Sequence, residues 1–299
     1  EIMLQQTQVK TVIPFYLRFI KTYPNLKKLM LADEDQIIAL WSGLGFYRRA
    51  KNIFKAKEHI KNKFGGKFPN NYSDLVSLPG IGESTAGAIM SIAFKESHPI
   101  LDANVKRVLT RHSKIVEDSP SKKNKLLWKI SRRQTPKYNT FDYTQGIMDL
   151  GARICKPKFP LCSECPIVDI CESAFEVTEE KPKQKLSKSK PEIDITFTLA
   201  YTDNYFLLFK RNEETFWQSL WLPSEQPKVH RILKKNSCYK KNIDKKHKFT
   251  HLDLNLSITL LKYNEVFDIK TNAEYRWIKK IDINNIGMPA PIKKIILEL

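Results

Sequence analysis

The stretch that decides the fold of the first half of the chain is 78-LPGIGESTAGAI-89. A Pro-Gly-x-Gly turn between two short helices leaves backbone N–H groups at the start of the second helix, where a phosphate can bind. Gly80 and Gly82 let the backbone approach a ligand closely, because neither carries a side chain. The pattern indicates a phosphate-binding turn, although a simple connection between two helices has the same signature.

Helical periodicity extends on both sides of this turn. Apolar residues recur at three- and four-residue spacings in "MLQQTQVKTVIPFYLRFI" (3–20), "DQIIALWSGLGF" (35–46), "ESTAGAIMSIAF" (83–94) and "DANVKRVLTRH" (102–112). Pro14 and Pro79 fall where a helix starts or a turn forms. Asp102 occupies the N-cap position of the last of these helices, which is a common structural choice for aspartate. We therefore predict a mainly helical segment up to about residue 175.

The cysteines indicate a metal site. Four of the five fall within seventeen residues with the spacing C-x6-C-x2-C-x5-C, namely Cys155, Cys162, Cys165 and Cys171, whereas Cys238 stands alone. A secreted disulfide framework spreads its pairs along the chain, so one tight cluster points to metal instead. Zinc ribbons use two well-separated C-x2-C pairs, and this spacing therefore favours a [4Fe–4S] cluster, with zinc as the alternative.

The charge balance is strongly basic. Fifty-one Lys and Arg residues face 32 Asp and Glu residues, which gives a formal net charge of +19. Such a surface suits nucleic acid, because neutralising phosphates releases condensed counterions; a solvated lysine-rich surface is the plainer alternative. There is no basic-then-apolar signal segment, and no apolar run of about 18 residues that could span a membrane. We expect a soluble cytoplasmic protein.

The second half of the chain has a different pattern. The stretch "EEKPKQKLSKSKP" (179–191) is rich in lysine and proline and predicts a linker at 178–192. After it, "IDITFTLAY" (193–201), "YFLLFK" (205–210) and "FTHLDLNLSITLL" (249–261) alternate as strands do, and "APIKKIILEL" (290–299) predicts an amphipathic helix. The expected fold is a mainly α domain over 1–177, with a cysteine loop at 155–171, followed by an α+β domain over 193–299.

In this order, "LPGIG", "LDANVKRV" and the cysteine spacing resemble the endonuclease III superfamily of helix-hairpin-helix DNA glycosylases. "EIMLQQTQV" (1–9) and "WSGLGFYRRAKN" (41–52) narrow the resemblance to its adenine DNA glycosylase branch, and "FWQSLWLP" (216–223) resembles that branch's Nudix-like recognition domain. The resemblance extends nearly end to end. It implies a monomeric bacterial enzyme with a [4Fe–4S] cluster that binds duplex DNA and hydrolyses the N-glycosidic bond of adenine mispaired with 8-oxoguanine or guanine.

The resemblance also implies the catalytic residues. Glu1 corresponds to the acid that protonates N7 of an extruded adenine, and Asp102 to the carboxylate that stabilises or captures the oxocarbenium-like sugar. Ser84 stands where bifunctional relatives carry a Schiff-base lysine, so we expect base excision without efficient strand cutting. Asn104 resembles a position that orients the sugar or the attacking water.

The DNA contacts follow from the same resemblance. The residues that it places at the lesion strand are Gln5, Gln6, Thr7, Leu44 and Phe46, and those in the hairpin are Gly80 and Gly82. It places Gln145 in the adenine pocket, and it places Phe249, Thr250 and His251 at the 8-oxoguanine site. Relatives usually have tyrosine at position 46, and a phenyl ring keeps the stacking wedge but loses a hydroxyl. After "WLPSEQ" no clustered glutamates are available to hold Mg²⁺, so pyrophosphate hydrolysis is not expected.

Two other functions remain open at this point. An endonuclease III-like enzyme for oxidised pyrimidines is disfavoured by Ser84 and by the second domain. A lesion-binding module without turnover is the other alternative. It follows from the expectation that the chain begins at Glu1 inside its first catalytic helix, without a preceding segment that in relatives helps to wall the adenine pocket.

Overall fold

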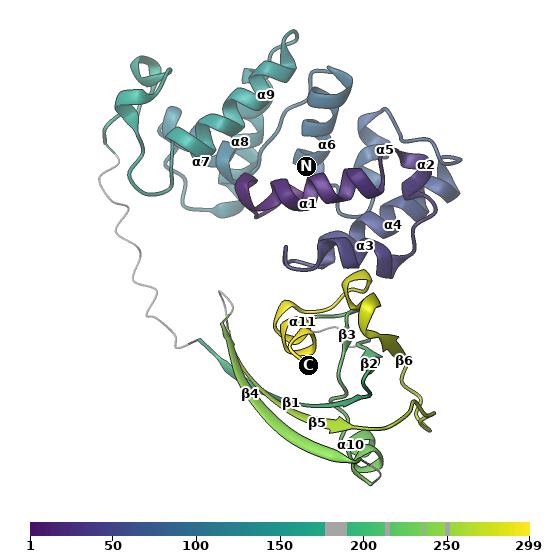
Figure 1. Cartoon of the computed structure of the whole chain (residues 1–299). Coiled ribbons are helices and arrows are strands. Elements are labelled where there is room, and N and C mark those ends of the chain that lie inside the picture. The colour runs from purple at the N-terminus through teal and green to yellow at the C-terminus, as the bar shows by residue number, and fades with distance from the viewer. Residues whose placement is uncertain (177–189, 213–215, 236, 249–251) are drawn as a thin grey trace. The chain divides into compact units, whose positions relative to one another are not determined.

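The computed structural model describes residues 1–176, 190–212, 216–235, 237–248 and 252–299 (Figure 1). These residues form two compact units, one combining residues 1–7 with 55–176 and the other combining residues 8–54 with 190–299. Most of the predicted linker at 178–192 lies outside the described residues. The grouping of residues 8–54 with the C-terminal sheet was not expected, and the domain boundaries 1–177 and 193–299 stay predictions.

The first unit is helical, as the spacing of apolar residues predicts. It contains the 3-10 turn η1 (Ile2–Leu4), the latter part of α4 (Arg48–Lys63), α5 (Tyr72–Ser77), α6 (Glu83–Ile89), η2 (Met90–Phe94), α7 (Ala103–His112), α8 (Pro120–Gln134), α9 (Thr140–Asp149) and η3 (Leu150–Ile154). Its core is a cluster of apolar side chains from α6 to α9, namely Ala88, Ile100, Leu101, Val105, Val108, Leu109, Leu127 and Ile147. Beyond η3, the cysteine loop contains only the short turns η4 (Cys162–Glu164) and η5 (Val168–Ile170).

The helical periodicity over residues 3–20 does not correspond to one continuous helix. The 3-10 turn η1 ends at Leu4, and α1 (Val9–Thr22) begins only after an interruption. Gln6 within this interruption has φ +56°, in the left-handed region that a continuing helix does not allow. The polar run at 5–8 supplies no apolar side chain for a core-facing stripe, so packing does not enforce a helix there. Pro14 lies inside α1 and does not start it.

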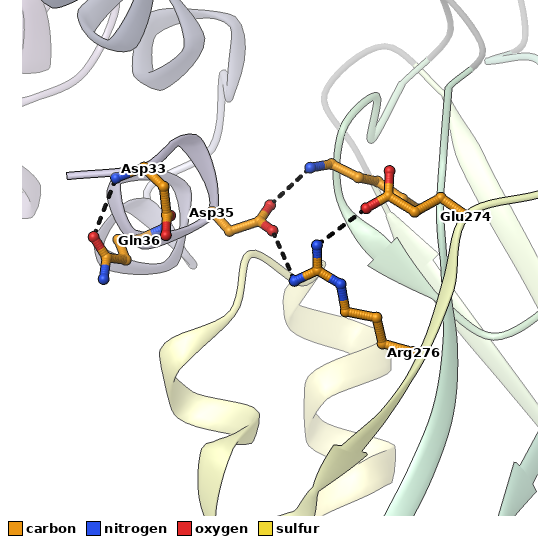
Figure 2. Close-up of polar contacts among 6 residues, drawn as sticks. Asp33, Asp35, Gln36, Glu274 and Arg276 are labelled. Carbon is orange, nitrogen blue, oxygen red and sulfur yellow. Dashed lines mark hydrogen bonds and ion pairs between the residues drawn. The ribbon is translucent and has the colours of Figure 1, made fainter.

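The helical part of the second unit consists of α1, α2 (Leu26–Leu29), α3 (Glu34–Trp41) and the start of α4. The start of α3 is well defined by a capping box (Figure 2). The Asp33 carboxylate accepts a hydrogen bond from the backbone N–H of Gln36 at 2.7 Å, and the Gln36 side chain accepts one from the N–H of Asp33 at 3.1 Å. In the part of the chain that the structure describes, no helix is long and apolar enough to cross a membrane.

A six-stranded sheet forms the rest of the second unit. It contains β1 (Glu192–Tyr201), β2 (Tyr205–Lys210), β3 (Trp221–Leu222), β4 (Tyr239–Lys248), β5 (Asp253–Lys262) and β6 (Tyr275–Lys279). Its order is β3-β2-β1-β5-β4, with β6 pairing β2. β1 pairs β5 in parallel, whereas β1–β2 and β4–β5 are antiparallel, and Figure 1 shows β1, β5 and β4 as long, curved strands.

Three helical segments accompany the sheet: α10 (Pro227–Lys234), η6 (Lys280–Asn285) and α11 (Ala290–Leu297). The predicted strands at 193–201 and 205–210 and the predicted C-terminal helix are confirmed. Strand β4 escaped prediction because its sequence, YKKNIDKKHK, is polar on both faces and almost wholly exposed. Lysines on such an edge strand discourage pairing with other chains.

Candidate functional site

The predicted hairpin joins α5 to α6 in the first unit. Gly80 has φ +82°, a left-handed conformation that a glycine adopts without strain, so this position requires glycine. Gly82 is the N-cap of α6 and makes no side-chain cap, and a Cβ at this position would meet nothing within 4 Å. Conformation therefore demands only the first of the two glycines in the hairpin.

The first turn of α6 connects two segments that the sequence places far apart. The side-chain amide of Gln5 donates to the carbonyl of Gly80 at 3.2 Å and to the hydroxyl of Thr85 at 3.3 Å. The hydroxyl of Ser84 accepts the backbone N–H of Leu101 at 2.9 Å. The segment that begins with the exposed Glu1 and the segment that leads into Asp102 are thus both attached to the same helical turn.

Asp102 is the N-cap of α7, as predicted. Its half-buried carboxylate accepts the backbone N–H of Val105 at 2.7 Å. Two residues further on, the side-chain oxygen of Asn104 accepts a hydrogen bond from Arg107 at 2.9 Å. A Cβ on Gly151 would lie 2.7 Å from the Cβ of Asn104, so α7 packs closely against the start of η3.

Two arginines of α7 hold the cysteine loop, and sequence analysis missed both. Arg107 donates to the carbonyls of Cys155 and Gly151, at 2.6 Å and 2.5 Å. Arg111 donates to the carbonyls of Lys156 and Pro157, at 2.7 Å and 2.9 Å. Burial lowers the pKa of Arg107, and the nearby thiol of Cys155 partly opposes this effect. The only signal in the sequence is the i, i+4 spacing of the two arginines, which puts them on one face of α7.

The four clustered cysteines are half-buried thiols without disulfide bonds. Burial raises the pKa of Cys171, a backbone hydrogen bond from Ser173 lowers it, and the other three thiols raise it because they lie close enough to interact with it. Among the described residues, no three His, Cys, Asp or Glu side chains converge closely enough for a single metal ion. Tetrahedral Zn²⁺ would require sulfur atoms about 3.8 Å apart. Four half-buried thiols on one short loop are donors of the type that either a zinc ion or a four-iron cluster takes.

The predicted lesion-strand residues of the second unit lie in the loop after α3. Leu44 is only 6% exposed, so in this conformation it packs inside the unit and does not face solvent. Phe46 is 56% exposed and has φ +50°, which is unusual for an aromatic residue. The indole N–H of Trp41 donates to the carbonyl of Gly45 at 3.0 Å, and the guanidinium of Arg49 lies 5.2 Å from the centre of the Phe46 ring. Phe159 and Phe175 combine a positive φ with exposure in the same way, so this feature alone does not assign a function to Phe46.

The remaining predicted site residues are less closely defined. Gln6 is exposed, Thr7 is half-buried, and Gln145 is half-buried on α9. Phe249, Thr250 and His251, predicted to read 8-oxoguanine, lie outside the described residues. The roles of these residues stay predictions.

Comparison with known proteins agrees with this architecture. Residues 1–133 match the model of the HhH-GPD superfamily of base excision DNA repair proteins, and residues 195–298 match a NUDIX domain. The structure is similar to that of a thermostable thymine-DNA glycosylase, with 27% identity, a TM-score of 0.53, and coverage of 58% of this chain and 81% of that one. The hairpin fold followed by a Nudix-like sheet defines the class: a helix-hairpin-helix base excision repair protein.

Two curated relatives define the family more narrowly. Adenine DNA glycosylase of Buchnera aphidicola subsp. Schizaphis graminum is 40% identical over 310 residues, which cover 99% of this chain and 88% of the relative. Adenine DNA glycosylase of Schizosaccharomyces pombe is 29% identical, with 96% of this chain and 76% of the relative covered. The chain belongs to the adenine DNA glycosylase family.

Proposed function

We propose that the protein is a monofunctional DNA glycosylase that removes adenine paired with 8-oxoguanine or guanine from duplex DNA. The observation that supports this most strongly is the attachment of the Glu1 segment and the Asp102 segment to the first turn of α6. In this family, excision of a base requires that a proton donor and a stabilising carboxylate of the protein act on the same nucleotide. The hydrogen bonds of Gln5 and Ser84 link the segments that carry these two groups.

The proposed chemistry uses the two carboxyl groups in different roles. The Glu1 carboxyl protonates N7 of an extruded adenine, so that the base leaves as a neutral molecule. The ionised Asp102 carboxylate stabilises or captures the positive sugar that remains. Asp102 is already held in a defined orientation, because its carboxylate is bonded to the N–H of Val105. Asn104, tied to Arg107, orients the sugar or the attacking water.

Ser84 supports base excision without strand cutting. A hydroxyl cannot form the Schiff base through which bifunctional glycosylases cleave the backbone. Its oxygen accepts the N–H of Leu101, so the side chain also holds the segment that leads to Asp102. The product of the proposed reaction is therefore an intact strand with an abasic site.

We propose that the cofactor is a [4Fe–4S] cluster held by Cys155, Cys162, Cys165 and Cys171. The chemistry of the donor set fits, because four thiols share one neighbourhood and all are half-buried. The cluster would hold the cysteine loop together and would take no part in breaking the glycosidic bond. Arg107 and Arg111 join this loop to α7, the helix that Asp102 caps.

The proposed partner is double-stranded DNA bound by a protein monomer. The net charge of +19 favours a polyanion, and the hairpin at Gly80 and Gly82 offers backbone N–H groups to a phosphate. The residues proposed to probe the strand that carries the lesion are Gln5, Gln6, Thr7, Leu44 and Phe46. Gln145 is proposed to line the adenine pocket, and residues 249–251 to read 8-oxoguanine.

A panel of duplexes tests the proposal. Single-turnover base release is measured on duplexes with A opposite 8-oxoguanine, A opposite G, A opposite T, and thymine glycol opposite A, with Glu1→Gln as the control variant. The expected result is release of adenine from the first two duplexes, fastest opposite 8-oxoguanine, and none from the Glu1→Gln variant. Release of thymine glycol would favour an endonuclease III-like enzyme, and tight binding without any release would favour a lesion-binding module.

A further inference from the structure

The loop that carries Phe46 has anchors outside its own segment. Tyr47, which follows Phe46 directly, accepts the N–H of Gly43 at 3.4 Å and donates its hydroxyl hydrogen to the carbonyl of Met288 at 3.3 Å. The hydroxyl of Ser42, at the other end of the loop, donates to the same carbonyl at 3.0 Å. Both ends of the loop are therefore tied to one backbone oxygen near the C-terminal helix.

The segment around Met288 is itself firmly held in the second unit. The carbonyl of Gly287 accepts the N–H of Trp221 in β3 at 2.8 Å, and Met288 is fully buried. A Cβ on Gly287 would come within 2.3 Å of the side chain of Ile38 in α3, so the two segments are in tight contact. Burial raises the pKa of Tyr47, whose hydroxyl also accepts the N–H of Gly43.

The start of α3 is fixed to the sheet as well (Figure 2). The Asp35 carboxylate lies 3.1 Å from the Lys210 ammonium and 3.8 Å from the Arg276 guanidinium. Both cations also lie over the ring of Trp221, Lys210 at 5.6 Å and Arg276 at 4.8 Å from its centre. α3 is thus attached at its first turn, through Asp35, and at the loop that follows it, through Ser42.

We propose that the carbonyl of Met288 is the anchor that positions the exposed ring of Phe46 for insertion into DNA, with Ser42 and Tyr47 as positioning residues. This proposal rests on the wedge role of Phe46 given under the proposed function. Phe46 is held at φ +50°, a conformation that persists only when its surroundings enforce it. The two hydroxyl–carbonyl bonds supply that constraint from the C-terminal part of the chain, and so they pre-organise the wedge before DNA arrives.

Two measurements on the whole chain test the anchor. The variant combines Ser42→Ala with Tyr47→Phe, and the matched control is Tyr263→Phe, which removes a hydroxyl that donates to the carbonyl of Leu233 elsewhere in the same unit. The first measurement is amide hydrogen exchange over residues 43–46 without DNA. The second is the Kd for an A·8-oxoguanine duplex, measured for the variant and the control with Phe46 present and with Phe46→Ala.

The anchor predicts faster exchange at residues 43–46 in the variant and unchanged exchange in the control. It predicts a Kd raised on the order of 25-fold in the double variant when Phe46 is present, about fivefold for each of the two hydroxyls, and a Kd changed by less than about twofold when Phe46 is alanine. Unchanged loop exchange would overturn the proposal, and so would an equal loss of affinity in the Phe46→Ala background. Faster exchange together with a Phe46→Ala variant that binds normally would support the anchor and refute the wedge role of Phe46.

Discussion

Asp102 offers a prediction that separates a structural role from a catalytic one. As the N-cap of α7 its carboxylate accepts the N–H of Val105 at 2.7 Å, and many aspartates in proteins do nothing more. In the proposed reaction the same carboxylate stabilises the sugar cation. Asp102→Asn keeps an amide oxygen at the N-cap but removes the charge, whereas Asp102→Ala removes both.

The two variants should affect stability very differently. Asparagine caps helices about as well as aspartate, so Asp102→Asn should lose only the charge–dipole contribution, about 0.3–1 kcal/mol. Asp102→Ala should lose the cap as well, for a total of about 1–2 kcal/mol. Urea unfolding followed by circular dichroism measures both free energies of unfolding.

The rate of adenine release should depend on the negative charge of Asp102 and not on its hydrogen bond at the N-cap of α7. Loss of a carboxylate that interacts with the reacting sugar should slow single-turnover adenine release by about 10²–10⁴-fold in both variants, because neither carries the charge. The rate is measured at saturating enzyme on an A·8-oxoguanine duplex, so that weaker binding does not contribute. An Asp102→Asn variant that works within a few-fold of the parent would show that Asp102 is only a helix cap and would refute this assignment.

Three further predictions follow from individual contacts. Gly287→Ala should destabilise the protein by about 1–3 kcal/mol through overpacking against Ile38, and Ile38→Ala should recover part of this loss; strictly additive effects in urea unfolding would argue against the contact. Arg111→Gln should lower the iron retained per chain after dialysis against a chelator, because the cysteine loop loses the two hydrogen bonds that Arg111 donates to its carbonyls, whereas the exposed Arg153→Gln should not. Burial raises the pKa of Tyr263 to about 12, above the value of about 10 in the unfolded chain, so its contribution to stability is complete below pH 10 and is lost between pH 10 and 12. Tyr263→Phe should therefore flatten the fall in the thermal midpoint over that range, and a fall as steep as in the parent would contradict this cause.

The parts of the fold that sequence predicts are those set by local patterns. The hairpin at 78–89 depends on a glycine with positive φ at position 80, and α7 depends on an aspartate cap followed by apolar residues at helical spacing. Both signals lie within a dozen residues and need no knowledge of the rest of the chain. The four cysteines could be identified for the same reason.

Other features depend on contacts that no local pattern records. The interruption at residues 5–8 is accompanied by a hydrogen bond from the side chain of Gln5 to the hairpin 75 residues away. Leu44 lies in a glycine-containing loop that the sequence predicts to contact DNA, but its side chain packs inside the second unit. Backbone carbonyls accept the hydrogen bonds of Arg107, Arg111, Ser42 and Tyr47. Every residue has such a carbonyl, so the sequence does not indicate which one accepts the bond.

The central claim is that Glu1 and Asp102 act on one extruded nucleotide. The most direct test is a crystal structure of the protein bound to a duplex that carries a non-cleavable 2′-fluoro-deoxyadenosine opposite 8-oxoguanine. We predict that the adenine lies outside the helix, with the Glu1 carboxyl at about 2.6–3.2 Å from N7 and the Asp102 carboxylate facing the sugar carbon that bears the base. An adenine bound elsewhere, or the two carboxyl groups in separate cavities, would contradict the account.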